Sequence, residues 1–477
     1  MKLSQLLEDV EYQGTAPEGD IIFITDDSRR VSPGCLFVCV KGRHFDGHTM
    51  AARALEAGAI CVVAERNTGA SPELLVKNSR EAYALLCAAF YGHPARKLSL
   101  VGVTGTNGKT TTSILLKKIF DSAGYRTGLV GTNMNMVGRE EFPAALTTPD
   151  PWELQGLFSK MAQAGCTHCF IEVSSQALDQ QRVAGLKFSA GIFTNLTQDH
   201  LDYHGSFEAY RQAKQTLFSQ CELAIVNIDD EAGPQMLQHS NAIPVTYSLS
   251  SNNADYTAKN LSLRADGVSY ELVSRGMIGR VKFGVPGAFS VYNSLAAACT
   301  ALELGLELKQ VLPALAESGG VKGRMEVVPT NTPYTVIIDY AHSPDGLENV
   351  LDALRETTTG RLITVFGCGG DRDRAKRPIM GRIAAERSDI AIVTSDNPRS
   401  EDPEAIIADI LEGMPKNKAH VITQPDRKLA IAQALKKARE GDVVLLAGKG
   451  QETYQILATG RIDMDEREIV KELTIEN

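Results

Sequence analysis

"LSLVGVTGTNGKTTTS", residues 98–113, places an apolar strand, a glycine-rich loop and a helix start in immediate succession. That order is typical of a phosphate-binding loop, in which glycines let the backbone approach phosphate oxygens. The common pattern G-x-x-x-x-G-K-[ST] is not met, because Val103 stands where its first glycine belongs. Gly105 and Gly108 give a different spacing, so the stretch predicts a nucleotide-binding α/β domain whose phosphate loop has its own glycine pattern.

Polar residues on and near this loop indicate how it would hold phosphate. Lys109 would place a point charge near the β and γ phosphates at the helix N-terminus; a glycine-rich turn with a lone lysine is the alternative. Glu172 ends the apolar run CFIEVSS, where a carboxylate ligand of Mg²⁺ would lie beside the Thr110 hydroxyl. A glutamate at a strand end can also be solvated or cap a helix.

Length and composition limit the possible classes of protein. The 477 residues are too many for one core, and a size of about 150 residues per domain suggests roughly three domains. The net charge of -9 gives no general reason to bind nucleic acid or an anionic membrane. No run of about 18 apolar residues occurs, so we expect a cytoplasmic protein without stable membrane insertion.

The 9 cysteines lie in apolar contexts and are odd in number. They suit buried thiols in a reducing compartment better than a disulfide framework. Cys166 and Cys169 form a C-x-x-C pair, but no second pair accompanies it, so we expect core cysteines there instead of a zinc site.

The pattern of apolar runs predicts an α/β fold throughout. Short β-type runs with a helical stretch at 50–58 predict a small N-terminal α/β domain, and the Pro-containing basic segment 91–99 is a plausible linker. From Leu100, continuous apolar runs that alternate with helical stretches predict a doubly wound sheet of parallel strands. The polar, alternating region 255–283 predicts antiparallel edge strands.

A third α/β unit is predicted after residues 319–328. Its apolar runs YTVIIDYAH, RLITVFGCGGD, DIAIVTSDNP and DVVLLAGKG end near Gly, Asp or Asn. Because ligands collect beyond the carboxyl ends of parallel strands, these ends indicate a second binding surface.

The segment NLTQDHLDYHGSFEAYRQAK, residues 195–214, combines several metal-ligating residue types. His200 and His204 lie there with Asp199, Asp202 and Tyr203, but their spacing matches no zinc template, and the residues alone leave a metal role open. Lys214 lies on the following amphipathic helix, where it would ordinarily be solvated.

The chain resembles the Mur ligase family over essentially its whole length. The resemblance rests on motifs that occur in the family's order: TGTNGKTTT, IEVSS, TNLTQDHLDYHG, GRMEVV, DYAHSPDGL, FGCGGDRDRAKRP, SDNPRSEDP and AGKGQETYQ. They are most similar to the UDP-N-acetylmuramoyl-tripeptide synthetases. The resemblance implies an N-terminal UDP-substrate-binding domain at 1–97, a central P-loop ATPase domain at 98–325 and a C-terminal Rossmann-like domain at 326–477 that binds the amino acid.

It also implies the reaction, an ATP-dependent amide ligation in peptidoglycan precursor synthesis. A substrate carboxylate attacks the γ-phosphate to give an acyl phosphate, and an amine then displaces phosphate; fixed cations stabilise the developing charge. By resemblance, the catalytic residues are Lys109, Glu172, His200 and Lys214. The implied Mg²⁺ ligands are Thr110, Glu172, His200 and Lys214, the last in carbamylated form.

Further site residues follow from the same resemblance, position by position. Those expected at ATP are Gly105, Thr106, Asn107, Gly108, Lys109, Thr110, Thr111, Asn293, Arg324, Asp339 and His342. Those expected at the UDP-N-acetylmuramoyl-dipeptide are Asp26, Ser28, Arg43, His44, Phe45, Thr147, Thr148, Ser174, Gln180 and Arg182. Gln176 and Ala177 stand where the family is expected to have His and Gly, a departure that concerns the fine substrate contacts.

The tetrapeptide at 396–399, Asp-Asn-Pro-Arg, matches the family's amino-acid selector. It is also a strand-end turn before a capped helix. An arginine offers a planar fork for a carboxylate, and meso-diaminopimelate has a carboxylate at its far end that lysine lacks. The residues expected at the amino acid are Arg372, Asp396, Asn397, Pro398, Arg399, Gly448 and Glu452.

Three other functions are alternatives to this one. A folylpolyglutamate synthetase-like ligase would lack the extra N-terminal domain, and Arg399 argues against a lysine-adding sister ligase. A non-catalytic nucleotide-switch protein would not need the amino-acid clamp. The expected partners are small-molecule substrates, with no nucleic acid, and we expect a monomer.

Overall fold

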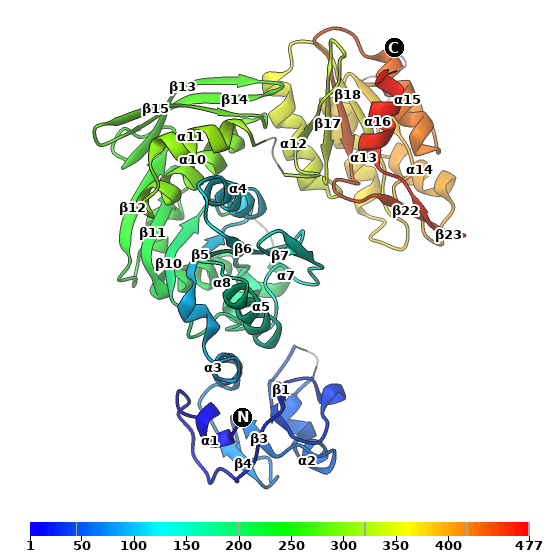
Figure 1. Ribbon diagram of the computed structural model, residues 1–477. Helices are drawn as coiled ribbons and strands as arrows, with labels where there is room; N and C mark the ends of the chain where they lie inside the picture. The colour runs from blue at the N-terminus through cyan, green and yellow to red at the C-terminus, as the bar shows by residue number, and fades with distance from the viewer. Residues whose placement is uncertain (44, 198–200, 319–320, 416–417, 476–477) are drawn as a thin grey trace. The chain divides into compact units, whose positions relative to one another are not determined.

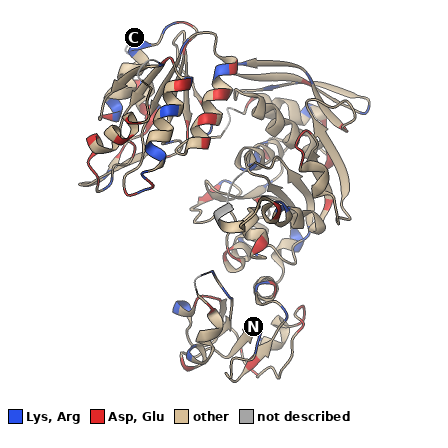
Figure 2. Cartoon of the chain, turned by 180° about the vertical axis from the view of Figure 1, so that it is seen from behind, with Lys and Arg blue, Asp and Glu red and all other residues tan. Residues whose placement is uncertain are grey.

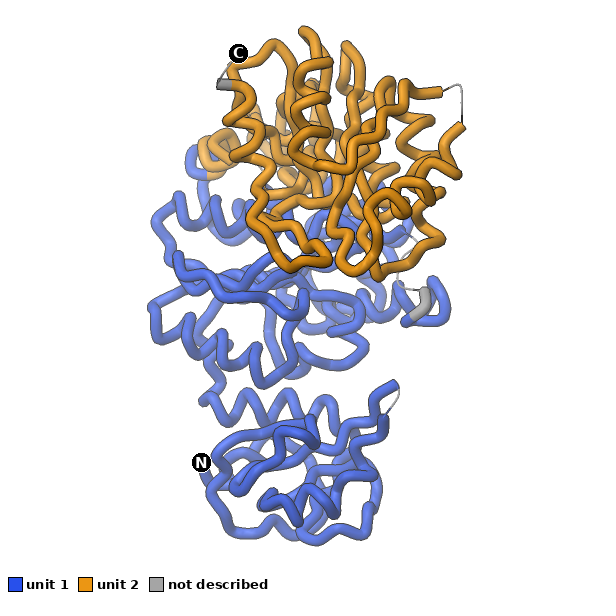
Figure 3. The backbone as a smooth tube through the Cα atoms, turned by 90° about the vertical axis from the view of Figure 1, so that its right-hand side faces the viewer, with its two compact units in different colours: residues 1–256, 296–310 blue, residues 257–295, 311–477 orange. Residues whose placement is uncertain are grey.

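The computed structural model describes residues 1–43, 45–197, 201–318, 321–415 and 418–475. Two compact units divide the chain, residues 1–256 with 296–310 and residues 257–295 with 311–477 (Figure 3). The chain passes from one unit to the other near β13 (Tyr256–Arg264) and within α10 (Ala288–Glu303) and α11 (Leu308–Ala316).

Unit 1 begins with a small parallel sheet of order β1-β2-β3-β4. Its strands are β1 (Phe23–Thr25), β2 (Cys35–Val38), β3 (Cys61–Ala64) and β4 (Glu73–Leu75), and its helices are α1 (Leu3–Leu6), α2 (Ala51–Glu56) and α3 (Ser79–Phe90) (Figure 1). Every residue of β2 and β3 is buried, as expected for parallel strands covered on both faces. The predicted small α/β fold of this region, including its helix near 50–58, is confirmed.

The strands that unit 1 contributes to the 11-stranded sheet follow the order β12-β11-β10-β5-β9-β6-β7-β8. These strands are β5 (Ser99–Thr104), β6 (Thr127–Val130), β7 (Asn135–Val137), β8 (Glu140–Phe142), β9 (His168–Glu172), β10 (Phe188–Phe193), β11 (Cys221–Asn227) and β12 (Ile243–Ser248). The strands from β12 to β6 pair in parallel, and β7 and β8 add antiparallel to them. The predicted doubly wound parallel sheet is therefore confirmed.

Helices of this region follow the strands in alternation. They are α4 (Lys109–Ser122), α5 (Pro151–Gln163), α6 (Ser175–Asp179), α7 (Leu201–His204), α8 (Phe207–Gln215) and α9 (Gly233–Met236). The linker segment contains a 3₁₀ turn, Pro94–Lys97. Phe90 and Tyr91 beside it stack on Trp152 of α5, with ring centroids 4.9 and 5.1 Å from the indole, so aromatic packing fixes the N-terminal sheet to the second one.

Unit 2 contains the antiparallel strands β13, β14 (Gly267–Ser274) and β15 (Met277–Phe283), as predicted for the polar region 255–283. Its main sheet has the order β16-β17-β21-β18-β19-β20. Those strands are β16 (Glu326–Val328), β17 (Thr335–Asp339), β18 (Leu362–Phe366), β19 (Ile390–Val393), β20 (His420–Thr423) and β21 (Val443–Ala447). All but β16 pair in parallel, so the carboxyl ends of β17, β18, β19 and β21 meet at one edge of the sheet.

The helices of unit 2 cover this sheet, and acidic and basic residues are interspersed along them (Figure 2). They are α12 (Pro344–Thr357), α13 (Lys376–Arg387), α14 (Pro403–Leu411), α15 (Arg427–Lys437) and α16 (Glu466–Ile475). A short hairpin of β22 (Tyr454–Leu457) and β23 (Gly460–Asp463) follows β21.

Candidate active site

The phosphate loop lies between β5 and α4, and its glycines are required by close packing. Gly105 has a φ of +150°, and a Cβ there would lie 1.9 Å from the Thr194 hydroxyl oxygen. Gly108, at a φ of +85°, precedes the first helical residue, Lys109. The backbone N–H groups of the first turn of α4 lack helical acceptors, which makes this helix start a suitable anion site.

Two lysines donate to the carbonyl groups of the loop. Lys109 Nζ lies 2.8 Å from both the Gly105 and the Thr106 carbonyl oxygens. Lys214 Nζ, from α8, lies 2.8 Å from the same Gly105 oxygen and 4.6 Å from the centre of the Tyr210 ring. Lys214 is buried, contrary to the solvated position that its helix pattern alone predicts. The fold thus brings its side chain to the loop from more than 100 residues away, at a sequence separation of 109.

Glu172 is a buried carboxylate beside the loop because β9 pairs in parallel with β5, with Glu172 opposite Val103. Its Oε2 accepts hydrogen bonds from the Thr110 and Thr132 hydroxyl groups at 2.8 and 2.9 Å. Its Oε1 accepts the Thr132 backbone N–H at 2.9 Å. A hydroxyl group and a carboxylate oxygen in contact at a helix start form a donor pair of the type that Mg²⁺ uses.

Four of the residues expected at the sugar-peptide form one hydrogen-bonded cluster. Arg182 Nη1 donates to the Thr148 carbonyl oxygen at 2.6 Å, and its Nη2 donates to Gln180 Oε1 at 2.8 Å. The Ser174 backbone N–H donates to the Thr148 hydroxyl oxygen at 3.1 Å. Burial lowers the pKa of the Arg182 guanidinium. Thr147 adjoins the cluster, and its hydroxyl oxygen lies 3.0 Å from that of Thr132.

Tyr203 joins this cluster although sequence reasoning gave it no substrate role. Gln180 Nε2 donates to its hydroxyl oxygen at 3.0 Å. The Arg43 guanidinium lies over the Tyr203 ring at 4.9 Å, so the structure connects Arg43 of the N-terminal region to the Thr148–Arg182 cluster. Phe45 is an exposed aromatic side chain on the same loop as Arg43.

The remaining expected residues of this group have local roles in the described structure. Ser28 is the first residue of a 3₁₀ turn. Asp27, which follows Asp26 in the chain, caps this turn. Burial, followed by the nearby Asp150 carboxylate, raises the pKa of Asp26. His44 and His200 lie outside the described residues. Over the residues that are described, no group of three or more His, Cys, Asp or Glu side chains is arranged to hold a metal ion.

The nucleotide residues expected in unit 2 gather around Tyr340, except Asn293, which is buried on α10. The Arg324 guanidinium lies over the Tyr340 ring at 5.2 Å, and the His342 ring centroid lies 4.5 Å from that of Tyr340. Asp339 accepts the Met325 N–H at 2.7 Å, and burial raises its pKa. Arg324 Nε is buried without a hydrogen-bond partner within the described ranges, which leaves a donor for an acceptor group of a ligand.

The selector turn at 396–399 is fixed by backbone contacts with a second loop. Arg399 has a φ of +52°, and its Nη1 donates to the Gly370 carbonyl oxygen at 2.7 Å. The Gly370 N–H donates to the Asn397 carbonyl oxygen at 2.9 Å, and a Cβ on Gly370 would lie 1.9 Å from the Pro398 oxygen. Only glycine fits so close an approach. Arg372 lies on this second loop, and a Cβ on Gly369 would lie 2.9 Å from Arg399 Nη1 and 3.7 Å from Arg372 Cγ, so the two expected arginines lie close together.

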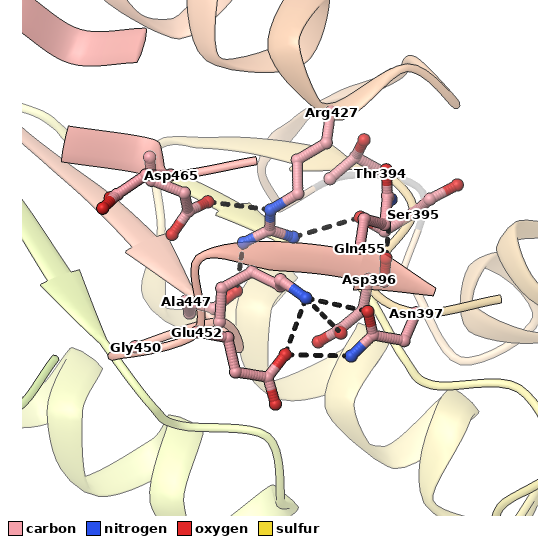
Figure 4. Close-up of polar contacts among 12 residues, drawn as sticks. Thr394, Ser395, Asp396, Asn397, Arg427, Ala447, Gly450, Glu452, Gln455 and Asp465 are labelled. Carbon is pink, nitrogen blue, oxygen red and sulfur yellow. Dashed lines mark hydrogen bonds and ion pairs between the residues drawn. The ribbon is translucent and has the colours of Figure 1, made fainter. Parts of the chain in front are cut away.

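Glu452 and Asn397 face each other in the same cluster (Figure 4). Asn397 Nδ2 donates to Glu452 Oε2 at 3.0 Å. Lys449, a residue that sequence reasoning missed, donates to that same oxygen at 2.7 Å and to Asn397 Oδ1 at 2.8 Å. Gly448, at a φ of +114°, would bring a Cβ to 2.7 Å from Asp396 Oδ2, so its lack of a side chain makes room for that carboxylate.

Comparisons with known proteins show the family of the chain. Residues 20–91 match the Mur ligase family, catalytic domain; residues 103–301 match the Mur ligase middle domain; and residues 323–450 match the Mur ligase, glutamate ligase domain. A UDP-N-acetylmuramoyl-L-alanyl-D-glutamate--2,6-diaminopimelate ligase 1 of Clostridium acetobutylicum is 45% identical over 99% of this chain and 99% of its own length. The chain belongs to the Mur ligase family.

Other members of the family are similarly close over their full length. A UDP-N-acetylmuramoyl-L-alanyl-D-glutamate--2,6-diaminopimelate ligase of Bacillus velezensis is 44% identical over 100% of this chain and 99% of its own. A solved structure of a ligase with that name superposes with a TM-score of 0.78 at 33% identity, covering 100% of this chain and 99% of its own. The three-domain Mur ligase architecture expected from the sequence is thereby confirmed. No helix of the described residues is long and apolar enough to span a membrane.

Proposed function

We propose that this chain is the ATP-dependent ligase that adds meso-diaminopimelate to UDP-N-acetylmuramoyl-L-alanyl-D-glutamate, through an acyl phosphate, in peptidoglycan precursor synthesis. The family membership, with relatives of that activity aligned along the full length, is the observation that supports it most. The selector turn with its fixed Arg399 agrees with the choice of amino acid.

The residues around the phosphate loop fit ATP. ATP supplies the phosphoryl group that activates the substrate carboxylate. The helix start after Gly108 would receive the phosphates, and Lys109 would exchange its two carbonyl contacts for phosphate oxygens. On unit 2, the stacked Tyr340 and Arg324, with the unpartnered Arg324 Nε, suit the base and ribose.

We assign Mg²⁺ to the pair of Thr110 and Glu172. Their oxygens already lie in contact, and a buried carboxylate is better stabilised beside a cation than beside hydroxyl groups alone. Bound Mg²⁺ would neutralise charge on the phosphates. A second ion is assigned to His200 and to Lys214 in its carbamylated form. A carbamate keeps one N–H, so the contact of Lys214 with the Gly105 oxygen can persist after modification.

The Thr148–Arg182 cluster is assigned to the peptide part of the nucleotide substrate. Arg182 is already oriented by Gln180 and Thr148, and a pre-oriented guanidinium can bind a carboxylate in bidentate fashion. The hydrogen bond from the Thr148 hydroxyl to the Glu172 carbonyl oxygen, 2.7 Å long, connects this cluster to the phosphate loop region. Arg43, through Tyr203, would extend it toward the sugar and UDP.

The amino acid is assigned to unit 2, where Arg372 and Arg399 would hold its far carboxylate and Glu452 its far ammonium group. We further assign domain limits of 1–97, 98–325 and 326–477, a monomeric state and a cytoplasmic location. The domain limits follow from the linker positions, and the location agrees with the small-molecule substrates that we propose.

Phosphate release tests the proposal directly. Purified protein with ATP and Mg²⁺ should release phosphate only when the UDP-sugar-dipeptide and an amino acid are both present, and meso-diaminopimelate should be strongly preferred to lysine. Steady ATP turnover without either substrate would overturn the ligase assignment. An equal rate with lysine would overturn the choice of amino acid and leave the ligase assignment standing.

A further inference from the structure

A buried ammonium group, that of Lys449, lies among the residues assigned to the amino acid. Lys449 follows β21 in the chain, and its side chain is fully buried. Its Nζ donates to Glu452 Oε2 at 2.7 Å and to Asn397 Oδ1 at 2.8 Å. Asp396 Oδ1 lies 3.9 Å from the same nitrogen. Asn397 and Glu452 can be followed in Figure 4. Lys449 therefore lies between the only two acidic residues assigned to the amino-acid site.

The contacts of Lys449 also determine which oxygen of Glu452 faces a ligand. Lys449 and Asn397 both bind Oε2, and neither contacts Oε1. Asn397 is held in turn, because its Oδ1 accepts the Ile456 N–H at 2.9 Å and so joins β22 to the selector turn. With one oxygen occupied and the carboxamide fixed, Glu452 Oε1 has a defined direction for an incoming ammonium group.

Charge balance gives Lys449 a second consequence. Among Lys449 and the residues assigned to the amino acid, the cations Arg372, Arg399 and Lys449 outnumber the carboxylates Asp396 and Glu452 by one. Two carboxylates on the same loops are engaged elsewhere: Glu401 forms an ion pair with Arg377, and Asp371 accepts the Ser400 hydroxyl. Diaminopimelate differs from lysine by a further carboxylate at the far end, so a positive excess favours it. Without Lys449 the cations and carboxylates of the cluster would be equal in number, and two carboxylates would lie close together without the ammonium group between them.

We infer that Lys449 is a positioning residue that orients Glu452 and sets the charge of the amino-acid site, so that a substrate with two carboxylates is preferred to one with a single carboxylate. This inference rests on the proposed function. It adds to that function a determinant of substrate preference other than Arg399.

Three variants test the inference. Lys449→Met keeps the length of the side chain and removes its charge, while Lys449→Arg keeps the charge. Arg361→Met is the matched control, because Arg361 forms an ion pair with the buried Asp442 at the amino ends of β18 and β21, away from the selector turn. For each variant, kcat/KM with diaminopimelate and with lysine, KM for ATP and the unfolding temperature are measured.

Lys449→Met should narrow the ratio of kcat/KM for diaminopimelate over lysine by about tenfold or more, while KM for ATP changes less than about twofold. Lys449→Arg should retain most of the ratio, and Arg361→Met should retain all of it even if its unfolding temperature falls. An unchanged ratio in Lys449→Met would overturn the inference. So would an equal narrowing in Arg361→Met, since that outcome would trace the effect to stability.

If Lys449→Met does not fold, the double variant Lys449→Met with Glu452→Gln replaces it, because it removes a cation and a carboxylate together. The kcat/KM of this double variant should remain higher with diaminopimelate than with lysine. Equal values for the two amino acids would overturn the charge-balance argument. The wild-type protein separates this test from that of the proposed function: if it forms no amide with either amino acid, the proposed function itself fails.

Discussion

The guanidinium of Arg377 is completely buried and forms an ion pair with Glu401, with Nη2 and Oε1 2.8 Å apart. Its Nη1 also contacts Asp409 at 2.8 Å. Glu401 Oε1 accepts the Asp371 N–H, and Asp371 accepts the Ser400 hydroxyl at 2.6 Å. Arg377 thus supports both loops that carry Arg372 and Arg399, the arginines that we assign to the amino acid, without being among the assigned residues.

Arg377→Met should therefore weaken binding of diaminopimelate and also destabilise unit 2. Removing Arg377 leaves the partly exposed carboxylates of Glu401 and Asp409 without their cation, which lowers the free energy of unfolding. We expect KM for diaminopimelate to rise about tenfold or more as the 369–372 loop loosens, with KM for ATP nearly unchanged. Steady-state kinetics and thermal unfolding measure the two effects. A lower unfolding temperature with an unchanged KM for diaminopimelate would restrict Arg377 to a structural role.

The same ion pairs predict how stability depends on pH. Hydrogen bonds from Arg377 lower the pKa of Glu401 and of Asp409 below their ordinary values of 4.5 and 3.8. Because the folded state lowers these pKa values, the stabilisation is fully present above the ordinary values and is lost as the pH falls through the lowered ones. The difference in unfolding temperature between wild type and Arg377→Met should be largest near neutral pH and shrink below about pH 4. A difference that grows on acidification would contradict this sign.

Much of the fold follows from local sequence patterns. The continuous apolar runs predicted the central parallel strands, and the glycine spacing predicted the loop between β5 and α4, because both signals lie within a few residues. The short strand β20, which is only partly buried, gave no comparable signal and was not predicted. The aromatic contact of Tyr91 with Trp152 was not predicted either, since it joins a linker to a helix far along the chain.

The site residues that lie within a local sequence motif could be predicted. Those whose position depends on tertiary contacts were harder to predict. Glu172 is the last residue of β9 and Arg399 lies in the turn that follows β19, as their motifs indicated. The amphipathic pattern of its helix predicts that Lys214 is exposed to solvent. Only the tertiary fold brings Lys214 into contact with the Gly105 carbonyl oxygen. The contact of Lys449 with Glu452 is local, but its contact with Asn397 joins residues 52 positions apart, and no local pattern indicates that Lys449 connects the two.

Arg399→Ala should raise KM for diaminopimelate by about 30-fold or more and leave KM for ATP nearly unchanged. Removing the charged partner of a bound carboxylate costs about 2 kcal/mol or more in binding free energy. Arg399→Lys is the matched variant: it keeps the charge but loses the planar fork, so its KM should lie between those of wild type and Arg399→Ala. An unchanged KM in Arg399→Ala would remove Arg399 from the selector.

Glu172→Gln should reduce kcat/KM by at least about 100-fold, because an amide oxygen is a poorer ligand for Mg²⁺ than a carboxylate. The single oxygen of glutamine can still accept from the Thr110 and Thr132 hydroxyl groups, but its amide nitrogen cannot accept the Thr132 N–H, so the unfolding temperature should also fall. The dependence of the rate on Mg²⁺ concentration is the measurement, and the variant should require higher concentrations. If Glu172→Gln were as active as the wild type at low Mg²⁺ concentration, Glu172 would not be a ligand of the metal.

Lys214→Ala should be inactive and should regain part of its activity when a small carboxylate such as acetate is added. The substitution removes a buried side chain next to the Gly105 carbonyl oxygen, which leaves a space that an acetate ion can enter. If the functional group is a carbamate, the added carboxylate replaces its negative charge, whereas an added alkylamine replaces only a cation and should not restore activity. Lys214→Arg, which keeps a cation but cannot form the same carbamate, should also be inactive. Rescue by the alkylamine alone would show that the ammonium form of Lys214 serves the reaction. Full activity of Lys214→Ala without additives would show that the reaction needs no modified lysine.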